Sequence, residues 1–192
     1  LDEMEQFARA NKIPVILRDT RAFLENLCKT EQPQNILEIG MAIGYSGSCM
    51  LRACDAHLTC CEASLPNIAL ARENFEKLGL ANRVSIVTGD CLRTLPTLRG
   101  RTFDLIFLDG PKGLYLEILD LLLPLLDKHG VLIADNVLFR GMVEDGQPIL
   151  EPRFVHTVEV MRQFIDRLQH DKRFITKVHH IGDGLCEVRY RG

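Results

Sequence analysis

The segment from Phe103 to Asn136 constrains the fold of this chain more strongly than any other. Two short apolar runs, Leu105–Leu108 and Val131–Ala134, flank a pattern in which leucines recur at helical spacing up to Leu126, and Gly130 separates this pattern from the second run. Apolar runs without alternation on both sides of an amphipathic helix are typical of buried parallel strands joined by a crossover. The segment therefore predicts an α/β fold built on a parallel sheet.

Polar side chains follow both of these runs. Asp109 comes directly after the first run, and Asp135 and Asn136 follow the second. Parallel strands joined by a crossover point the same way, so we expect these residues at one carboxyl edge, where open α/β sheets bind ligands. Such oxygen ligands suit a hard cation such as Mg²⁺. The alternative is that they serve only as turn residues. Polar residues occur at the matching ends of both predicted strands, and Lys112 lies beside the first of them. This coincidence favours a functional site over turn residues alone.

Composition places the chain among globular proteins. Its 192 residues, 46% hydrophobic and 26% charged, suit a single domain over residues 1–192. The net charge of −3 gives no support for a broad nucleic-acid-binding surface. No apolar run approaches the roughly 20 residues that cross a bilayer, so no membrane association is expected. Seven cysteines without a C-x-x-C pair indicate a reducing cytoplasm, with neither disulfides nor a zinc site.

The remaining sequence predicts further strands and helices around this unit. We expect strands at Ile36–Gly40, His57–Glu62 and Val84–Thr88, helices at 1–12, Asp19–Cys28, Ser46–Cys54, Leu65–Leu78 and Phe154–Leu168, and a hairpin of Phe174–Ile181 and Leu185–Tyr190. The result is a doubly wound, mostly parallel, seven-stranded sheet with the C-terminal hairpin as an antiparallel edge. Residues 1–34 form a predicted helical cap that covers a cofactor or packs against a second subunit, and Val137–Pro152 forms a predicted lid over the site.

A glycine loop follows the first predicted strand. Gly40 and Gly44 lie between a strand and a helix, but they lack the spacing of the dinucleotide fingerprint. Glu62, 22 positions after Gly40, ends the second strand, where an acid binds ribose hydroxyls. Glu62 does not distinguish between NAD and S-adenosylmethionine as the cofactor. Glu38 helps to distinguish them, because a carboxylate before the loop would repel the pyrophosphate of NAD and would suit the ammonium and the sulfonium of S-adenosylmethionine. The alternative for Glu38 is a polar cap on the strand end.

Together these motifs resemble those of a known family. Leu37-Glu38-Ile39-Gly40-x-x-x-Gly44-Tyr45-Ser46 resembles the first motif of class I methyltransferases, and its Tyr-Ser ending is typical of the cation-dependent O-methyltransferases, the catechol and caffeoyl-CoA methyltransferase group. Phe107-Leu108-Asp109-Gly110-Pro111-Lys112-x-x-Tyr115 and Ala134-Asp135-Asn136-Val137 match the metal and catalytic motifs of that group. The resemblance covers Ile36–Val143 strongly and implies a Rossmann-like methyltransferase fold.

The resemblance also implies roles for individual residues. Asp109, Asp135 and Asn136 fall on the metal ligands, and Lys112 falls on the catalytic lysine. The cofactor contacts fall on Glu38, Gly40, Gly44, Tyr45, Ser46, Glu62, Gly89, Asp90, Cys91 and Asp109. The implied reaction is Mg²⁺-dependent methyl transfer from S-adenosylmethionine to a hydroxyl with a neighbouring oxygen. Lys112 would take the hydroxyl proton once the cation and burial lower its pKa towards about 7–8. The alternative is a solvated lysine, or one paired with Asp109.

A bacterial subgroup of this family carries a more detailed resemblance. Asp109–Tyr115 and Asp135–Gly141 resemble motifs of the tRNA 5-hydroxyuridine methyltransferases, which favours 5-hydroxyuridine at the tRNA wobble position as the acceptor. A catechol-type small molecule fits the same metal site and stays open. RNA would contact Arg140 and stack on Phe139 or Tyr115, although arginines on a mildly acidic protein are usually solvated. A nicotinamide-dependent oxidoreductase is a further alternative, and the family implies a homodimer.

Overall fold

The structure is a computed structural model that describes residues 1–192. The helices are α1 (Asp2–Ala10), α2 (Arg18–Glu31), α3 (Tyr45–Ala53), α4 (Leu65–Lys77), α5 (Cys91–Thr94), α6 (Tyr115–Leu122) and α7 (Val155–His170). The strands are β1 (Asn35–Ile39), β2 (His57–Glu62), β3 (Val84–Thr88), β4 (Phe103–Leu108), β5 (Leu126–Asp135), β6 (Phe174–His179) and β7 (Leu185–Tyr190). Short 3₁₀ turns are η1 (Ala81–Arg83), η2 (Leu95–Leu98), η3 (Lys112–Leu114), η4 (Leu123–Leu125) and η5 (Pro152–Phe154). None of the helices combines the length and the apolar character that a bilayer crossing requires.

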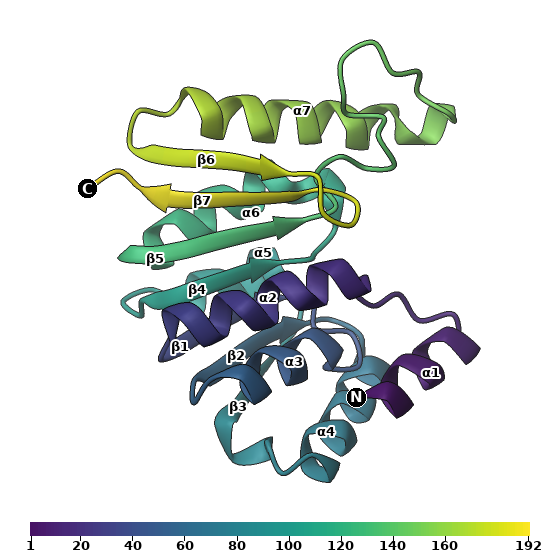
Figure 1. The fold of residues 1–192 in the computed structure, drawn as a ribbon, viewed down its shortest axis with the longest axis vertical. Coiled ribbons are helices and arrows are strands. Elements are labelled where there is room, and N and C mark those ends of the chain that lie inside the picture. Colours follow the sequence, from purple (N-terminus) through teal and green to yellow (C-terminus); the bar gives the residue numbers. More distant parts are fainter.

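The strands form one seven-stranded sheet in the order β3-β2-β1-β4-β5-β7-β6 (Figure 1). Strands β1 to β5 pair in parallel, and β7 pairs antiparallel with both β5 and β6. The predicted doubly wound sheet with an antiparallel C-terminal edge is therefore confirmed. The strand order reverses between β1 and β4, which lie side by side. At such a reversal the loops after the two strands separate and leave room for a ligand.

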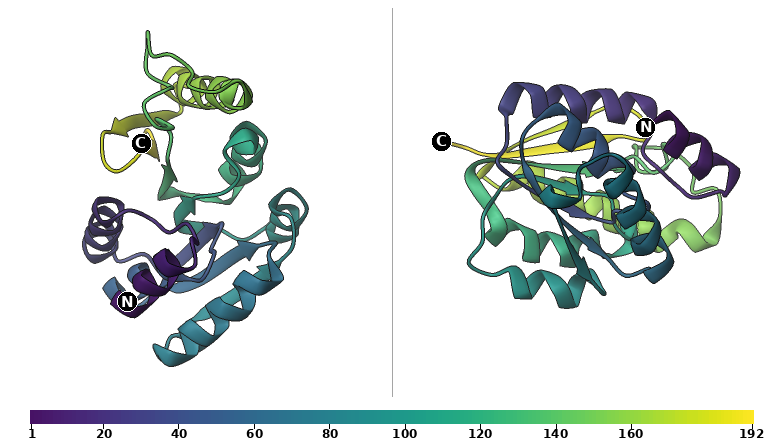
Figure 2. Two further views of the ribbon diagram at one scale, coloured as in Figure 1. Left: turned by 90° about the vertical axis from the view of Figure 1, so that its right-hand side faces the viewer. Right: turned by 90° about the horizontal axis from the view of Figure 1, so that it is seen from below.

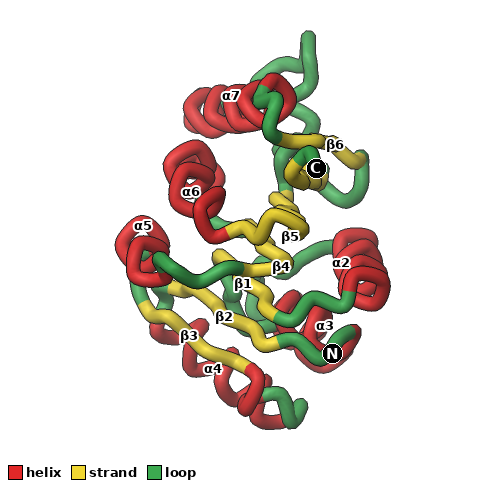
Figure 3. Tube along the Cα trace, turned by 90° about the vertical axis from the view of Figure 1, so that its left-hand side faces the viewer, coloured by secondary structure: helices red, strands yellow, loops and turns green.

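Helices cover both faces of this sheet. Figure 3 shows α2 and α3 on one side and α5, α6 and α7 on the other, and the turned views of Figure 2 show the same layers. Successive side chains of β1 pack alternately against the helices of one face and of the other, because a strand points successive side chains to opposite faces of the sheet. Leu37 and Ile39 pack in the core shared with α6 and α7, whereas Ile36 packs in the core shared with α3 and α4. Glu38 alternates with Leu37 and therefore also faces the α3 layer, where it is fully buried.

Strands β1 and β4 stay in contact beyond their last paired residues. The N–H of Asp109 donates to the carbonyl oxygen of Ile39 at 2.9 Å. A Cβ built on Gly40 would lie 2.2 Å from the carbonyl oxygen of Asp109, and Gly40 has a φ of +86°. The packing of one strand end against the other thus requires glycine here, in addition to any close approach of a ligand.

The crossover from β4 to β5 differs from the sequence prediction. The leucine pattern predicted one helix up to Leu126, but α6 ends at Leu122 and η4 follows it. Pro124 lies within η4 and cannot supply the N–H that a continuing α-helix needs. Strand β5 passes through Gly130, where a Cβ would meet two carbonyl oxygens of β4 at 2.9 and 3.0 Å. Gly130 therefore permits close strand pairing at a register shift rather than ending a helix.

Substitution of Gly40 by alanine is expected to destabilise the fold by about 3 kcal/mol or more, because the new Cβ would displace the Asp109 carbonyl. Gly79 supplies a matched control, since it has a φ of +69° and nothing lies within 4 Å of a Cβ built there. Gly79→Ala should cost only about 1 kcal/mol, the strain of a left-handed alanine. Urea unfolding of both variants measures the two values. Equal losses would mean that backbone strain alone requires glycine at position 40.

Candidate functional site

Two adjoining cavities lie at the carboxyl edge of the parallel strands. The larger cavity has a volume of about 770 Å³ and brings together the side chains of Asp109, Lys112, Asp135 and Asn136. The smaller cavity has a volume of about 290 Å³ and is lined by residues from the ends of β1, β2 and β3 and from the loop after β4. Gly40 and Glu62 line both cavities. The strand reversal thus opens one composite groove beside the glycine loop.

Asp109 and Lys112 form an ion pair at the end of β4. Nζ of Lys112 donates to Oδ1 of Asp109 at 2.5 Å. Burial of the ammonium acts to lower the pKa of Lys112, but Tyr115 and the carboxylate of Asp109 outweigh burial, and the pKa is raised above its usual range. The stated alternative, a lysine paired with Asp109, therefore describes this arrangement. The lowering of this pKa by a bound cation stays a prediction. Lys112 is held protonated by its partner.

Asp135 and Asn136 occupy the end of β5. Asp135 is 2% exposed, and its Oδ1 accepts the backbone N–H of Asn136 at 2.7 Å. Burial, together with the nearby charge of Asp109, raises the pKa of Asp135 to about 7. Asn136 has a φ of +57°, a left-handed conformation that asparagine tolerates better than most residues. Strand β5 therefore ends in a carboxylate and an amide that line the same cavity.

Tyr115 ties the ends of β4 and β5 together from beneath the site. It is fully buried, and its hydroxyl lies 3.0 Å from the carbonyl oxygen of Leu108 and 3.0 Å from that of Asp135. The hydroxyl can donate to one of these oxygens at a time. Because Leu108 directly precedes Asp109, Tyr115 helps to fix the spacing of the two strand ends. Its burial also means that the predicted stacking of Tyr115 on a base is wrong.

The oxygen atoms at these strand ends fit a hard divalent cation. The carboxylates of Asp109 and Asp135 and the amide of Asn136 line one cavity, in which Lys112 supplies the single ammonium. The raised pKa of Asp135 indicates that little positive charge compensates its carboxylate, and a divalent cation would supply that charge. No cluster of three or more His, Cys, Asp or Glu side chains with metal-binding spacing is present. A cation held by the side chains of Asp109, Asp135 and Asn136 would leave several of its usual roughly six positions to substrate and water.

Glu38 lies beneath the glycine loop and lines neither cavity. The hydroxyl of Ser46 donates to Oε1 of Glu38, and the thiol of Cys60 donates to Oε2 at 3.5 Å. Burial raises the pKa of Glu38 to about 7, although both hydrogen bonds act to lower it. Ser46 belongs to the first turn of α3. The structure thus places Glu38 and Ser46 together as a support for the junction between the loop and α3.

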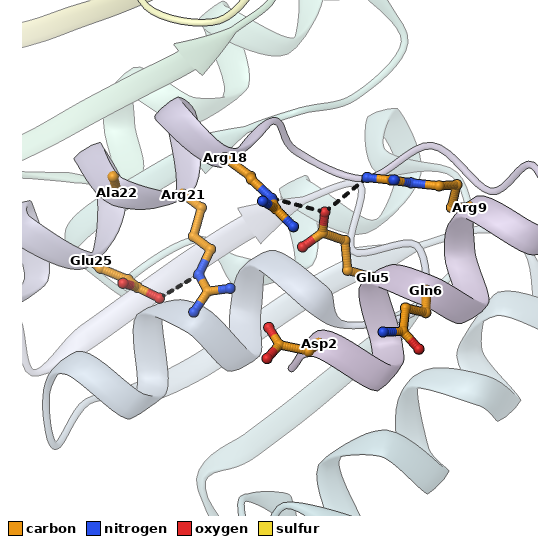
Figure 4. A pocket seen from close by; sticks show the side chains of 8 residues that line it. All are labelled: Asp2, Glu5, Gln6, Arg9, Arg18, Arg21, Ala22 and Glu25. Atoms are coloured by element: carbon orange, nitrogen blue, oxygen red, sulfur yellow. Dashed lines mark hydrogen bonds and ion pairs between the residues drawn. The ribbon is translucent and has the colours of Figure 1, made fainter.

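Gly44 and Tyr45 pack inward, away from the groove. Gly44 has a φ of +80°, and a Cβ there would lie 2.8 Å from the ring of Phe75. Tyr45 is 2% exposed, and its hydroxyl accepts a hydrogen bond from Nη1 of Arg21 at 3.2 Å. Arg21 lines a charged cleft of about 710 Å³ between α1 and α2, which Figure 4 shows. The side chain of Tyr45 therefore serves the packing of α2 on α3, and only its backbone is near the loop.

Glu62, Gly89, Asp90 and Cys91 line the smaller cavity. The two oxygens of Glu62 accept three backbone N–H groups of the adjoining loops at 2.8 to 3.0 Å. Oε1 accepts two of these N–H groups and Oε2 accepts one, so a lone pair of Oε2 is left to accept a hydrogen bond from a hydroxyl group. Asp90 caps the N-terminus of α5. The sequence prediction thus brought together four residues that do share one cavity.

Two segments that the sequence did not single out line the larger cavity. They are the linker Pro14–Leu17 between α1 and α2 and the turn residues Gly182 and Asp183 between β6 and β7. Figure 1 shows both segments at the edge where the parallel strands end. The predicted lid Val137–Pro152 lines neither cavity. The loop packs on α7, where Arg162 donates to three of its carbonyl oxygens at 3.0 to 3.5 Å.

This arrangement of strands, groove and polar residues agrees with a comparison with protein families. One family, described as O-methyltransferase, matches residues 2–191. The chain belongs to the O-methyltransferase family. Membership of this family speaks against the expected alternative of a nicotinamide-dependent oxidoreductase.

Individual relatives agree with this assignment. This chain is 36% identical to catechol O-methyltransferase of Niastella koreensis over 128 residues. The matched segment makes up 64% of this chain and 58% of that protein. The chain thus spans less than two thirds of that relative. The structure of the O-methyltransferase of Bacillus cereus in complex with SAH superimposes on this chain with a TM-score of 0.86 at 27% sequence identity. The superposition covers 99% of this chain and 90% of the Bacillus cereus chain. SAH-bound methyltransferase PaMTH1 of Podospora anserina gives a TM-score of 0.83 at 29% identity, covering 93% and 80%.

The free energy of unfolding of this protein is expected to fall as the pH rises from about 4.5 to 7, because burial raises the pKa of Glu38 over this interval. In this interval the unfolded side chain ionises while the buried one keeps its proton. The folded state then binds more protons, and stability decreases with pH by about 3 kcal/mol at most. Glu38→Gln mimics the protonated carboxyl and should be more stable to urea than the wild type at pH 8, with a smaller difference at pH 5.

Asp135 titrates in the same direction, so the wild type and the variant should both lose some stability as the pH rises. The difference between them isolates Glu38. A variant that is less stable than the wild type by the same amount at pH 5 and pH 8 would contradict this account.

Proposed function

We propose that this chain transfers a methyl group from S-adenosylmethionine to a hydroxyl that has a neighbouring oxygen, with the help of a divalent cation. The observation that carries the proposal is the meeting of Asp109, Lys112, Asp135 and Asn136 in one cavity that adjoins a second cavity beside the glycine loop. The two superimposed relatives hold SAH, the product that S-adenosylmethionine leaves after methyl transfer. Their ligand supports the same cofactor here.

The smaller cavity is the proposed place of the nucleoside part of the cofactor. Glu62 would accept a hydrogen bond from a ribose hydroxyl through Oε2, and Gly89, Asp90 and Cys91 would lie along the base. Glu38 and Ser46 would act on the cofactor through the loop that they support, since neither lines a cavity. When bound, S-adenosylmethionine supplies a methyl group on a sulfonium, and the sulfur leaves as a neutral thioether.

Asp109, Asp135 and Asn136 would hold the cation. A bound divalent cation lowers the pKa of a hydroxyl that it contacts and orients that hydroxyl together with its neighbouring oxygen. The carboxylates of Asp109 and Asp135 lie at the ends of two strands whose spacing Tyr115 helps to fix. The positions of these two carboxylates are thus set by the sheet, which suits a reaction that depends on the alignment of acceptor and methyl group.

Lys112 is the proposed proton acceptor. Asp109 now holds the ammonium protonated through a contact of 2.5 Å. With the charge of Asp109 shared with a cation, this ion pair would be weaker and the pKa of Lys112 lower. The ammonium would then release one proton to solvent, and the neutral Nζ would accept the proton of the hydroxyl. The acceptor oxygen then forms its bond to the methyl carbon as the bond from that carbon to sulfur breaks. The Nζ of Lys112 also lies 5.4 Å from the ring centroid of Tyr115, which helps to hold it in place.

Replacement of Lys112 by methionine is expected to lower kcat by about 100-fold or more, because the side chain keeps its length but cannot accept a proton. Its dissociation constant for S-adenosylmethionine should stay within about twofold of the wild type, because Lys112 does not line the smaller cavity. Lys77→Met on α4 is the control, since that side chain is 72% exposed. Single-turnover kinetics and calorimetry measure both quantities. An unchanged kcat would exclude Lys112 as the base.

A catechol-type molecule is the acceptor that we propose first. A relative at 36% identity is a catechol O-methyltransferase. The larger cavity is lined by four carboxylate side chains, those of Glu62, Asp109, Asp135 and Asp183, and by one ammonium. Even with a divalent cation bound, this lining opposes the entry of a polyanion and suits a neutral or cationic aromatic diol. The exposed apolar side chain of Leu17 lies on the same wall and can contact a ring.

A 5-hydroxyuridine in tRNA is the second proposed acceptor, and a cationic cluster outside the cavity favours it. The guanidinium groups of Arg140 and Arg153 lie 5.3 and 4.8 Å from the ring centroid of Phe154. Both arginines are exposed, and Arg140 follows Asn136 by four positions. Such a cluster beside the cavity could contact phosphates of an RNA loop while a single base enters.

Transfer of a labelled methyl group from S-adenosylmethionine decides between these acceptors. We expect label in a catechol, and loss of that label when a chelator is added and its return with Mg²⁺. The parallel acceptor is tRNA that carries unmethylated 5-hydroxyuridine. Label in this tRNA that disappears in an Arg140→Ala, Arg153→Ala double variant would instead establish the RNA substrate. Failure to label either acceptor by a protein that binds S-adenosylmethionine would contradict the proposed acceptor chemistry.

A further inference from the structure

The turn between β6 and β7, Gly182-Asp183-Gly184, supports the loop that follows Asn136. The N–H of Val137 donates to the carbonyl oxygen of Gly184 at 3.1 Å, and the N–H of Leu138 donates to that of Asp183 at 3.0 Å. The side chain of Asp183 adds a third hydrogen bond, because its Oδ1 accepts the N–H of Arg140 at 2.6 Å. Two segments far apart in sequence are thus joined at the rim of the larger cavity.

The supported loop has an unusual backbone conformation. Asn136, Phe139 and Arg140 have φ values of +57°, +42° and +60°. Residues other than glycine rarely adopt this left-handed region, and they keep it only where the surroundings hold them there. Of the backbone N–H groups of residues 137 to 140, the N–H of Arg140 donates to a side chain, and this side chain is that of Asp183. Asp183 therefore opposes the relaxation of this loop.

The turn itself is firmly packed on two sides. A Cβ on Gly184 would lie 2.4 Å from Cγ of Leu138, and a Cβ on Gly182 would lie 2.6 Å from Oγ1 of Thr20. The turn therefore fits closely between the loop and α2. A carboxylate on such a support is held in one place, and so is the loop bonded to it.

We propose that Asp183 is a positioning residue that directs the side chain of Asn136 into the larger cavity by holding the left-handed loop from Asn136 to Arg140. This inference rests on the proposed function, in which Asn136 is a ligand of the cation. Asp183 and Asn136 line the same cavity. Without the bond from Asp183 to Arg140, the loop keeps only its two backbone hydrogen bonds to the turn, and residues 139 and 140 lose the contact that opposes their relaxation. The amide of Asn136, at the start of this loop, is then held less firmly.

The test compares Asp183→Ala and Asp183→Asn in the full chain. Asparagine keeps an oxygen that can accept the Arg140 N–H, whereas alanine does not. Asp127→Ala is the matched control, because Oδ1 of Asp127 accepts the N–H of His129 at 2.8 Å at the opposite edge of the sheet. Amide hydrogen exchange at Arg140 without added cation reports on the hydrogen bond. Calorimetric titration with Mg²⁺ reports on the site.

Asp183→Ala should raise the exchange rate at Arg140 about tenfold and weaken Mg²⁺ binding about tenfold or more. Asp183→Asn should stay within about threefold of the wild type in both measurements, and Asp127→Ala should change neither. Tight Mg²⁺ binding by Asp183→Ala, or equal losses in the alanine and asparagine variants, would overturn the positioning role alone. A wild-type protein that does not bind Mg²⁺ would overturn the proposed function, and this inference with it.

Discussion

The contact between the backbone of Gly40 and the carbonyl oxygen of Asp109 is the constraint on which the site depends. A Cβ at Gly40 would lie 2.2 Å from that oxygen. The contact occurs where β1 and β4 lie side by side and the strand order reverses, so the loops after these strands diverge to opposite faces of the sheet. The same residue, Asp109, packs through its backbone and lines the larger cavity with its side chain. Packing and chemistry are therefore joined at one position.

The site concentrates negative charge in a poorly hydrated place. Burial raises the pKa of Glu38 and that of Asp135 to about 7, and the charges of nearby carboxylates act in the same direction for both. A structure selected only for stability would replace such groups by apolar residues of similar volume, since an unpaired buried charge costs free energy. Their presence at the ends of β1 and β5 supports the proposal of a cation and a positively charged cofactor at this edge.

The sequence predicted the parts of this arrangement that follow from local pattern. Strands His57–Glu62 and Val84–Thr88 have the predicted bounds, because apolar runs between turn residues fix a strand directly. Asp109 and Asp135 were placed at one edge by the direction of a crossover alone. Side-chain direction was harder, although alternation along β1 puts Glu38 on the face of Ile36 and so beneath α3. The raised pKa of Lys112 depends on Tyr115 and on the contact with Asp109, and the sequence offered the pairing with Asp109 only as an alternative.

Gly182 and Asp183, which the sequence did not place at the site, are brought there by distant strand pairing, and the antiparallel edge explains how. Strand β7 pairs with β5 so that Leu185 lies opposite Asp135. A strand that runs antiparallel starts where its neighbour ends, so the turn before β7 must lie at the carboxyl edge of β5. A parallel β7 would have started at the opposite edge and carried Asp183 away from the cavity. The antiparallel direction of β7 therefore brings a third segment of the chain, the turn that contains Gly182 and Asp183, to the ends of β4 and β5.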